Sequence, residues 1–218
     1  MSQLAERGEK WAKRNGRSPY NVMDQSDICG LPVGELAARD SILFMWATYP
    51  KLWEAFEVIA AWGFEYKTVG FTWVKTNPKG LKVRFGALVN LLCPLLGKAK
   101  FERWVRLDPA IVAGWHFGLG YHTRGNPEIC LLASRGRGLR RVDNSVPNLL
   151  VAPVGEHSQK PAETRCRIER LYGDLPRLEL FARQRAEGWA IWGYEAPGGS
   201  DVDLAPQRYK NGHVDSMR

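Results

Sequence analysis

The sequence lacks the patterns typical of disulfide-linked, metal-binding or membrane-spanning proteins. Its 218 residues include only four cysteines and four histidines, with no Cys-x-x-Cys pair and no spacing typical of zinc ligands. It contains no secretory signal and no apolar run long enough to cross a bilayer. These absences predict buried free thiols in a reducing compartment, no bound metal and no membrane, and a cytoplasmic location.

Signatures of several common enzyme classes are missing too. We find no Ser-His-Asp or Cys-His arrangement, no Walker loop and no pair of catalytic carboxylates. The chain does have 44% hydrophobic residues, enough for one sizeable core, and a formal net charge of +8. Such a charge favours nucleic acid as a partner. Because the charge is spread along the chain, an ordinary basic protein remains the alternative.

Alternating strand and helix patterns predict an α/β fold with a Rossmann-like, mostly parallel sheet. Strands are expected over 42–46, 66–75, 129–133, 149–152, 178–181 and 189–193. One helix should begin at Thr48 or Pro50 and end at Gly63, and another should run from an N-cap at Ser158 to Gly173. Two late strands without a helix between them predict an antiparallel pair at one edge. The core is expected to include the tryptophans Trp46, Trp53, Trp62 and Trp73.

A single domain is expected over residues 1–195, followed by a disordered tail over 196–218 that is rich in glycine, proline and charge. Within this domain, residues 81–113 alternate apolar clusters with basic residues. We interpret this segment as an inserted helical arm.

Three features are candidates for a ligand site. Lys75 ends an apolar strand, where its ammonium would suit the carboxylate of an amino-acid-like ligand, although a solvated lysine is the commoner outcome. The glycine-rich loop 118–128 offers an aromatic ring and short polar groups, as a flipped base requires, or it is simply a connection. Glu179 lies among apolar residues, where it either holds a ligand or pairs with Arg177 or Arg183.

Taken together, a series of segments resembles the MT-A family of adenine-N6 methyltransferases, which use S-adenosylmethionine to methylate RNA or DNA. They include Trp-Val-Lys-Thr-Asn at 73–77, His-Ser-Gln-Lys-Pro at 157–161 and Glu-Leu-Phe-Ala-Arg at 179–183. Further matches lie at 31–33, 43–48, 61–64 with 66–68, 118–128, 152–153 with 156, and 189–195, all in the order of the family. The resemblance implies a circularly permuted, Rossmann-like methyltransferase domain with its cofactor strand near the C-terminus.

The resemblance also implies the residues of a site. Those implied to hold S-adenosylmethionine are Lys75, Glu179, Arg183, Arg185, Tyr194 and Glu195. Those implied to line the target pocket are Tyr121, Thr123, Arg124, Asn126, Glu128, His157, Ser158, Lys160 and Pro161. DNA or RNA is the implied partner, and dimerisation with a like or unlike subunit stays open. Tyr194 departs from the family, which generally has asparagine there.

One departure concerns catalysis itself. The family motif Asp-Pro-Pro-Trp, expected shortly before residues 17–20, is absent from the 218 residues. In the family this motif stacks the target base and accepts hydrogen bonds from its amino group, which is catalysis by positioning. The first catalytic strand of the expected sheet is therefore missing, and no catalytic residue can be assigned.

Three hypotheses follow from this absence. In the first, the protein is an adenine-N6 methyltransferase whose sequence, as given, begins after the motif. In the second, the chain has lost catalysis and acts as a nucleic-acid-binding pseudo-enzyme or partner subunit. The third is a DNA-binding regulator with no cofactor site.

Overall fold

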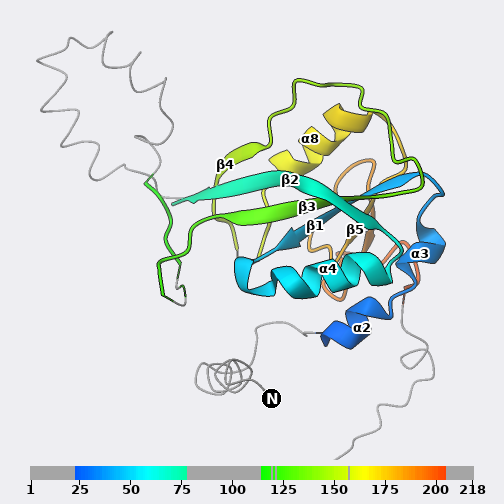
Figure 1. Cartoon of the computed structure of the whole chain (residues 1–218), viewed down its shortest axis with the longest axis horizontal. Helices are drawn as coiled ribbons and strands as arrows, with labels where there is room; N and C mark the ends of the chain where they lie inside the picture. The colour runs from blue at the N-terminus through cyan, green and yellow to red at the C-terminus, as the bar shows by residue number, and fades with distance from the viewer. Residues whose placement is uncertain (1–22, 78–113, 119, 121, 157, 205–218) are drawn as a thin grey trace, which may run out of the picture. The chain divides into compact units, whose positions relative to one another are not determined.

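The computed structural model describes residues 23–77, 114–118, 120, 122–156 and 158–204 (Figure 1). They fall into two compact units, of which one is the described part of Ala37–Leu175. The other comprises the described parts of Met1–Leu36 and Pro176–Arg218. The arm expected at 81–113 lies outside the described residues, and a single domain over 1–195 stays a prediction.

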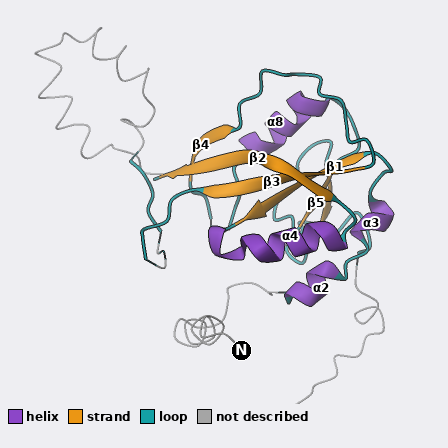
Figure 2. Ribbon diagram, in the orientation of Figure 1, coloured by secondary structure: helices purple, strands orange, loops and turns teal. Residues whose placement is uncertain are grey.

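The larger unit is built on a four-stranded sheet with the order β1-β3-β2-β4 (Figure 2). Strands β1 (Ser41–Ala47), β2 (Glu65–Thr76) and β4 (Leu149–Pro153) run in one direction, and β3 (Glu128–Arg135) runs antiparallel between β1 and β2. The α/β class is therefore confirmed. The antiparallel pair expected of the two late strands was wrong, because β5 (Leu178–Leu180) and β6 (Ala190–Trp192) pair in parallel. The antiparallel strand is instead β3, which lies inside the four-stranded sheet and bonds to a strand on each side.

Helix α4 (Leu52–Ala61) connects β1 to β2 and explains the space that β3 fills. A helical crossover returns the chain to a parallel strand, and here that strand, β2, is separated from β1 by the one position that β3 occupies. The helix follows the 3₁₀ turn η1 (Tyr49–Lys51), which carries Pro50 near its start as expected. It buries Ala55, Val58 and Ile59.

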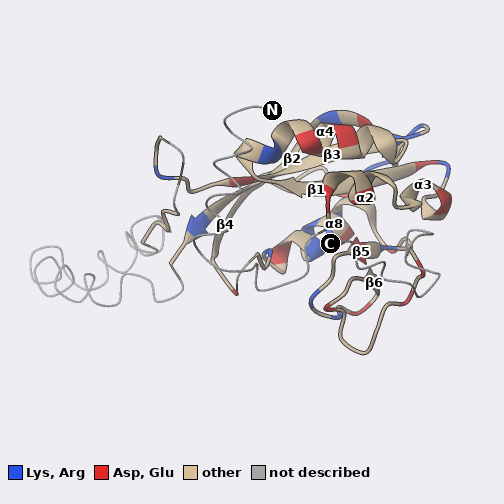
Figure 3. Ribbon diagram, turned by 90° about the horizontal axis from the view of Figure 1, so that it is seen from below, with Lys and Arg blue, Asp and Glu red and all other residues tan. Residues whose placement is uncertain are grey.

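Helix α8 (Glu163–Tyr172) lies on the face of the sheet opposite α4 (Figure 3). The ring of Tyr172 lies 6.2 Å from that of Phe44 in β1. Gly173, at φ 74°, ends the helix as predicted, since glycine adopts this conformation without strain. The predicted N-cap was wrong, because the helix begins five residues after Ser158, which itself has φ 63°.

The core of the larger unit lies around β2 and β3. Its most buried residues, each at most 1% exposed, are Phe71, Cys130, Leu131, Ala133 and Leu150. Trp62 and Trp73 are buried as predicted, but Trp53 is 75% exposed on α4, so its assignment to the core was wrong. Cys166 is exposed as well, contrary to the expectation of buried thiols.

The smaller unit contains two short helices, α2 (Gln25–Cys29) and α3 (Val33–Leu36), and a pair of parallel strands. These strands are β5 (Leu178–Leu180) and β6 (Ala190–Trp192). Residues 196–204, assigned above to the tail, are described as far as Leu204, which is 1% exposed. None of the described helices is long and apolar enough to span a membrane.

Candidate ligand site

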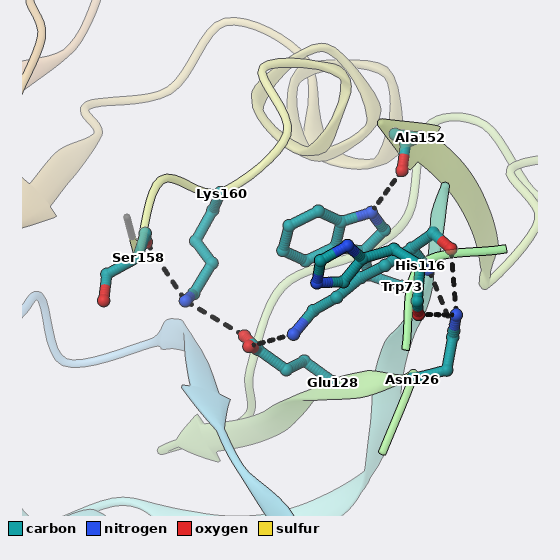
Figure 4. A network of polar contacts seen from close by, with 8 residues as sticks. Trp73, His116, Asn126, Glu128, Ala152, Ser158 and Lys160 are labelled. Carbon is teal, nitrogen blue, oxygen red and sulfur yellow. Dashed lines mark hydrogen bonds and ion pairs between the residues drawn. The ribbon is translucent and has the colours of Figure 1, made fainter. Parts of the chain in front are cut away.

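The C-terminal end of β2 is held in place by the side chain of Asn126 (Figure 4). The backbone N–H of Lys75 donates to Asn126 Oδ1 at 3.0 Å, and Asn126 Nδ2 donates to the Lys75 carbonyl at 2.9 Å. Asn126 Nδ2 also donates to the carbonyl of His116, whose own N–H donates to the Lys75 carbonyl at 3.0 Å. One amide side chain thereby replaces a strand partner and fixes the backbone that carries Lys75.

Two lysines converge on the carboxylate of Glu128, the first residue of β3 (Figure 4). Lys75 Nζ lies 2.6 Å from Glu128 Oε1, and Lys160 Nζ lies 3.0 Å from Oε2. Lys160 Nζ also donates to the Ser158 carbonyl at 3.1 Å. We call Lys75, Glu128 and Lys160 the lysine–glutamate cluster.

Burial and charge oppose each other at this cluster. The side chain of Glu128 is 13% exposed, and burial alone would raise the pKa of its carboxyl group. The charges and hydrogen bonds of Lys160 and Lys75 outweigh burial, so the pKa of Glu128 is lowered from its usual 4.5. The carboxylate is thus ionised at neutral pH, and the cluster carries a net charge of about +1.

Each carboxylate oxygen of Glu128 has a lysine partner. Oε2 is buried, and Lys160 Nζ makes an ion pair with it at 3.0 Å. A buried acceptor is costly unless a donor or a cation compensates it. The two lysines therefore fix the position of the carboxylate at the end of β2.

Two tryptophans lie against the lysines. Lys75 Nζ lies 5.2 Å from the ring centre of Trp73, and Lys160 Nζ lies 6.0 Å from that of Trp46. The two rings meet edge to face at 6.2 Å, and Trp73 Nε1 donates to the Ala152 carbonyl at 2.9 Å. The lysines are thus oriented by cation–π contacts as well as by Glu128.

The remaining residues expected at the target pocket are not all brought together. Thr123 and Arg124 are exposed. They lie in the loop between Gly118 and Gly125, and these two glycines form an antiparallel β-bridge. Pro161 lies just before α8, where its carbonyl accepts from Thr164 N–H at 3.0 Å. Tyr121 and His157 lie outside the described residues.

The residues expected at the cofactor are divided between the two units. Lys75 belongs to the larger unit, and the others lie in the smaller one, where Glu179 is the central residue of β5. Arg183 Nε lies 2.6 Å from Glu195 Oε2, joining the segments that follow β5 and β6. Arg185 instead makes hydrogen bonds to Asp201. A pocket shared by Lys75 and Glu179 stays a prediction.

Two residues of these networks were missed or misassigned from the sequence. Trp73 was assigned to the core alone, although the alternation of a strand puts it on the same face as Lys75. Asp201 was assigned to the tail, and no pattern in the sequence marked it. Among the described residues, no group of three or more histidines, cysteines and carboxylates is arranged to hold a metal ion.

The fold and this cluster define an α/β protein whose candidate ligand groups lie at the ends of strands. The sequence model of the MT-A70 family matches residues 7–90 and 103–195. The chain therefore belongs to the MT-A70 family.

Known relatives are similar over most of this chain. The Type II methyltransferase M.MunI of Mycoplasma sp is 29% identical over 181 residues, which are 82% of this chain and 60% of that protein. A probable N(6)-adenosine-methyltransferase MT-A70-like protein of Oryza sativa subsp. japonica is 28% identical over 203 residues, 91% of this chain and 24% of its own length. An N(6)-adenosine-methyltransferase MT-A70-like protein of Arabidopsis thaliana is also 28% identical, over 83% of this chain and 22% of its own length. The chain thus spans less than two thirds of each relative.

The lysine–glutamate cluster predicts a pH-dependent contribution to stability. In Glu128→Gln, two partly buried lysines lose their counter-charge, and we expect the free energy of unfolding at pH 7 to fall by about 1–3 kcal/mol. Because the folded-state pKa of Glu128 is lowered, this contribution is present above the usual pKa of 4.5 and is lost as the pH falls through the lowered value. Urea unfolding of wild type and variant between pH 7 and pH 3 measures both effects.

The matched control is Glu65→Gln. Glu65 Oε1 also lies 2.6 Å from a lysine, Lys67, but the side chain of Glu65 is 79% exposed. An exposed pair of this kind contributes about 0–1 kcal/mol. Equal losses in Glu128→Gln and Glu65→Gln would contradict the importance of the buried cluster.

Proposed function

We propose that this protein binds S-adenosylmethionine and methylates adenine at N6 in DNA or RNA. Membership of the MT-A70 family and the names of the plant relatives support this activity. The observation that carries the proposal is the lysine–glutamate cluster at the end of β2, a charged and partly buried group that is anchored by Asn126.

The residues of the smaller unit suit a nucleoside cofactor with an amino-acid tail. Phe181 and Tyr194 follow β5 and β6, and these two residues are 43% and 58% exposed. Arg183 and Glu195 lie beside them as a cation and an anion. Aromatic faces suit an adenine ring, and the charged pair suits hydroxyl and amino-acid groups. When bound, S-adenosylmethionine supplies a methyl group on a positively charged sulfur.

The lysine–glutamate cluster suits the target base or the amino-acid end of the cofactor. The Glu128 carboxylate is an acceptor of the kind to which the amino group of an adenine would donate. Lys75 and Lys160 are donors for a ring nitrogen or a carboxylate. Methyl transfer needs the amino nitrogen of the base aligned with the methyl group, so we assign these side chains to positioning.

We further propose that the fold is circularly permuted and that a strand bearing the family motif completes the sheet. Among the described residues, β1 pairs only with β3, and β5 pairs only with β6. An apolar strand such as β1, with one edge open, is normally paired or covered. The open edge of β1 supports the expectation that a further strand pairs there. A cytoplasmic location and a like or unlike partner subunit belong to the same proposal.

Nucleic acid as the partner is supported by the net charge of +8 and by two exposed aromatic rings beside the cluster. Trp115 and Phe117 are 38% and 53% exposed. Their segment is anchored to the end of β2 by a bridge between Thr76 and Trp115 and by Asn77 Nδ2, which donates to the Trp115 carbonyl at 3.0 Å. Exposed rings on a fixed backbone suit the stacking of unpaired bases. Helix α4 carries acidic but no basic residues, and α8 carries both signs, so charge alone does not mark one basic face (Figure 3).

Cofactor binding is the first test. We expect Arg183→Ala to weaken S-adenosylmethionine binding about tenfold or more, because a charge-assisted contact at the strand end is lost. Isothermal titration calorimetry measures the affinity. Arg177→Ala is the matched control, since Arg177 precedes β5 and contacts Trp189 and the Gly188 carbonyl. Absence of binding by the wild type would favour the regulator without a cofactor site.

Nucleic-acid binding is the second test. We expect Trp115→Ala and Phe117→Ala each to weaken binding of a single-stranded oligonucleotide by about 1–3 kcal/mol, through lost stacking. The slope of the logarithm of the binding constant against the logarithm of the salt concentration should not change, because no phosphate contact is removed. Fluorescence anisotropy at several salt concentrations measures both quantities.

The control for stacking is Trp53→Ala, which removes an equally large ring that is 75% exposed on α4. A second control is an oligonucleotide with abasic sites, for which wild type and variants should bind alike. A loss in Trp53→Ala equal to that in Trp115→Ala would argue against a specific platform.

Methyl transfer itself separates the enzyme from the pseudo-enzyme. The proposed activity predicts N6-methyladenine, detected by mass spectrometry, after incubation with S-adenosylmethionine and adenine-containing DNA or RNA. The absence of Asp-Pro-Pro-Trp from the 218 residues motivates the alternative, which predicts bound cofactor and no product. Product formed by this 218-residue polypeptide would eliminate that alternative, and an oligonucleotide without adenine is the control.

A further inference from the structure

Arg185 follows β5 and was expected, from the family resemblance, to contact the cofactor. In the structure its guanidinium is committed to the chain beyond β6. Nη1 donates to both carboxylate oxygens of Asp201, at 3.0 and 3.1 Å. Nε donates to the Pro197 carbonyl at 2.7 Å, and Nη2 donates to the Gly199 carbonyl at 2.9 Å. All three nitrogens therefore have partners within one short segment.

Asp201 in turn completes the outer edge of β6. Its backbone N–H donates to the Ile191 carbonyl at 2.8 Å, and its Oδ2 accepts from the Ile191 N–H at 2.9 Å. Ile191 is fully buried and is paired in register with Glu179 of β5. The hydrogen bond from Ile191 and those from Arg185 lower the pKa of Asp201, so its carboxylate stays charged at neutral pH. One carboxylate therefore links Arg185 to the strand beside Glu179.

The segment between Glu195 and Asp201 is a series of turns closed by this link. Gly199 N–H donates to the Ala196 carbonyl at 3.0 Å, and Gly193 N–H donates to Ser200 Oγ at 3.2 Å. Gly198 and Gly199 have φ of 73° and 90°, which permits the tight path around the guanidinium. Tyr194 and Glu195 lie directly before these turns, so their position depends on how the segment is held.

We propose that Arg185 is a positioning residue that acts through Asp201 to hold Tyr194 and Glu195 at the end of β6. This inference rests on the proposed function, since it assigns the held residues to S-adenosylmethionine. The planar fork of arginine is needed, because it reaches one carboxylate and two carbonyls at once. Lysine keeps the charge but offers a single nitrogen and cannot make the same three contacts.

The test compares Arg185→Ala, Asp201→Ala and the double variant by calorimetry with S-adenosylmethionine. We expect each single variant to weaken binding about tenfold, because a small displacement of binding groups is costly. The double variant should be no weaker than either single one, because both changes break the same link. Arg185→Lys should behave like Arg185→Ala, since the fork and not the charge is required.

Hydrogen exchange gives a readout that does not depend on the cofactor. In Arg185→Ala, the amides of Asp201, Gly199 and Gly193 should exchange faster than in the wild type, whereas amides of β2 should not change. The matched control is the ion pair between Arg170 Nη2 and Asp143 Oδ2, 2.8 Å apart and comparably exposed, in the other unit. Arg170→Ala and Asp143→Ala should leave cofactor affinity unchanged.

The outcomes separate this inference from the function on which it rests. If Asp201→Ala binds like the wild type while Arg185→Ala or the double variant loses affinity, Arg185 contacts the cofactor directly and the inference is overturned. It is also overturned if Arg185→Lys retains wild-type affinity. If the wild type binds no S-adenosylmethionine, the proposed function itself fails, whatever the exchange rates show.

Discussion

The carboxylate of Glu128, held between two lysines, is the interaction on which the candidate site depends. Its charge compensates Lys75, which comes from the end of β2, and Lys160, which comes from the segment before α8. These residues are far apart in the chain, so the cluster forms only once β2, β3 and that segment are in place. Removing the carboxylate would leave two neighbouring cations partly buried, which is unfavourable in a region of low polarity. The stability of the larger unit and the geometry of the candidate site are therefore coupled at this point.

The direction of β3 makes this coupling possible. Parallel strands present only their C-terminal ends at the edge where ligands bind, whereas an antiparallel strand presents its first residues there. Because β3 is reversed, Glu128 at its start lies beside Trp73 and Lys75 near the end of β2. The antiparallel strand thus contributes an acid to an edge where the parallel strand contributes a base.

Much of this arrangement could be predicted from the sequence, and the errors have physical reasons. Apolar runs located β1 to β6 closely, and Gly173 ended α8 as expected, because burial and glycine conformation are local signals. The N-cap at Ser158 was wrong since a suitable residue type does not ensure a suitable backbone conformation. Trp53 was assigned to the core from its neighbours, but it points away from the face of α4 that packs. The link between Arg185 and Asp201 depends on a path of glycine-rich turns that no periodic pattern reveals.

Asn77 and Gly114 lie side by side at the end of β2, and the Asn77 N–H donates to the Gly114 carbonyl at 2.8 Å. The chain thus leaves the end of β2 and returns beside it at two hydrogen-bonded residues. The entropic cost of holding these two residues together grows only slowly with the number of residues between them. A change in the length of chain between these two residues is therefore compatible with the same geometry of the neighbouring strand ends.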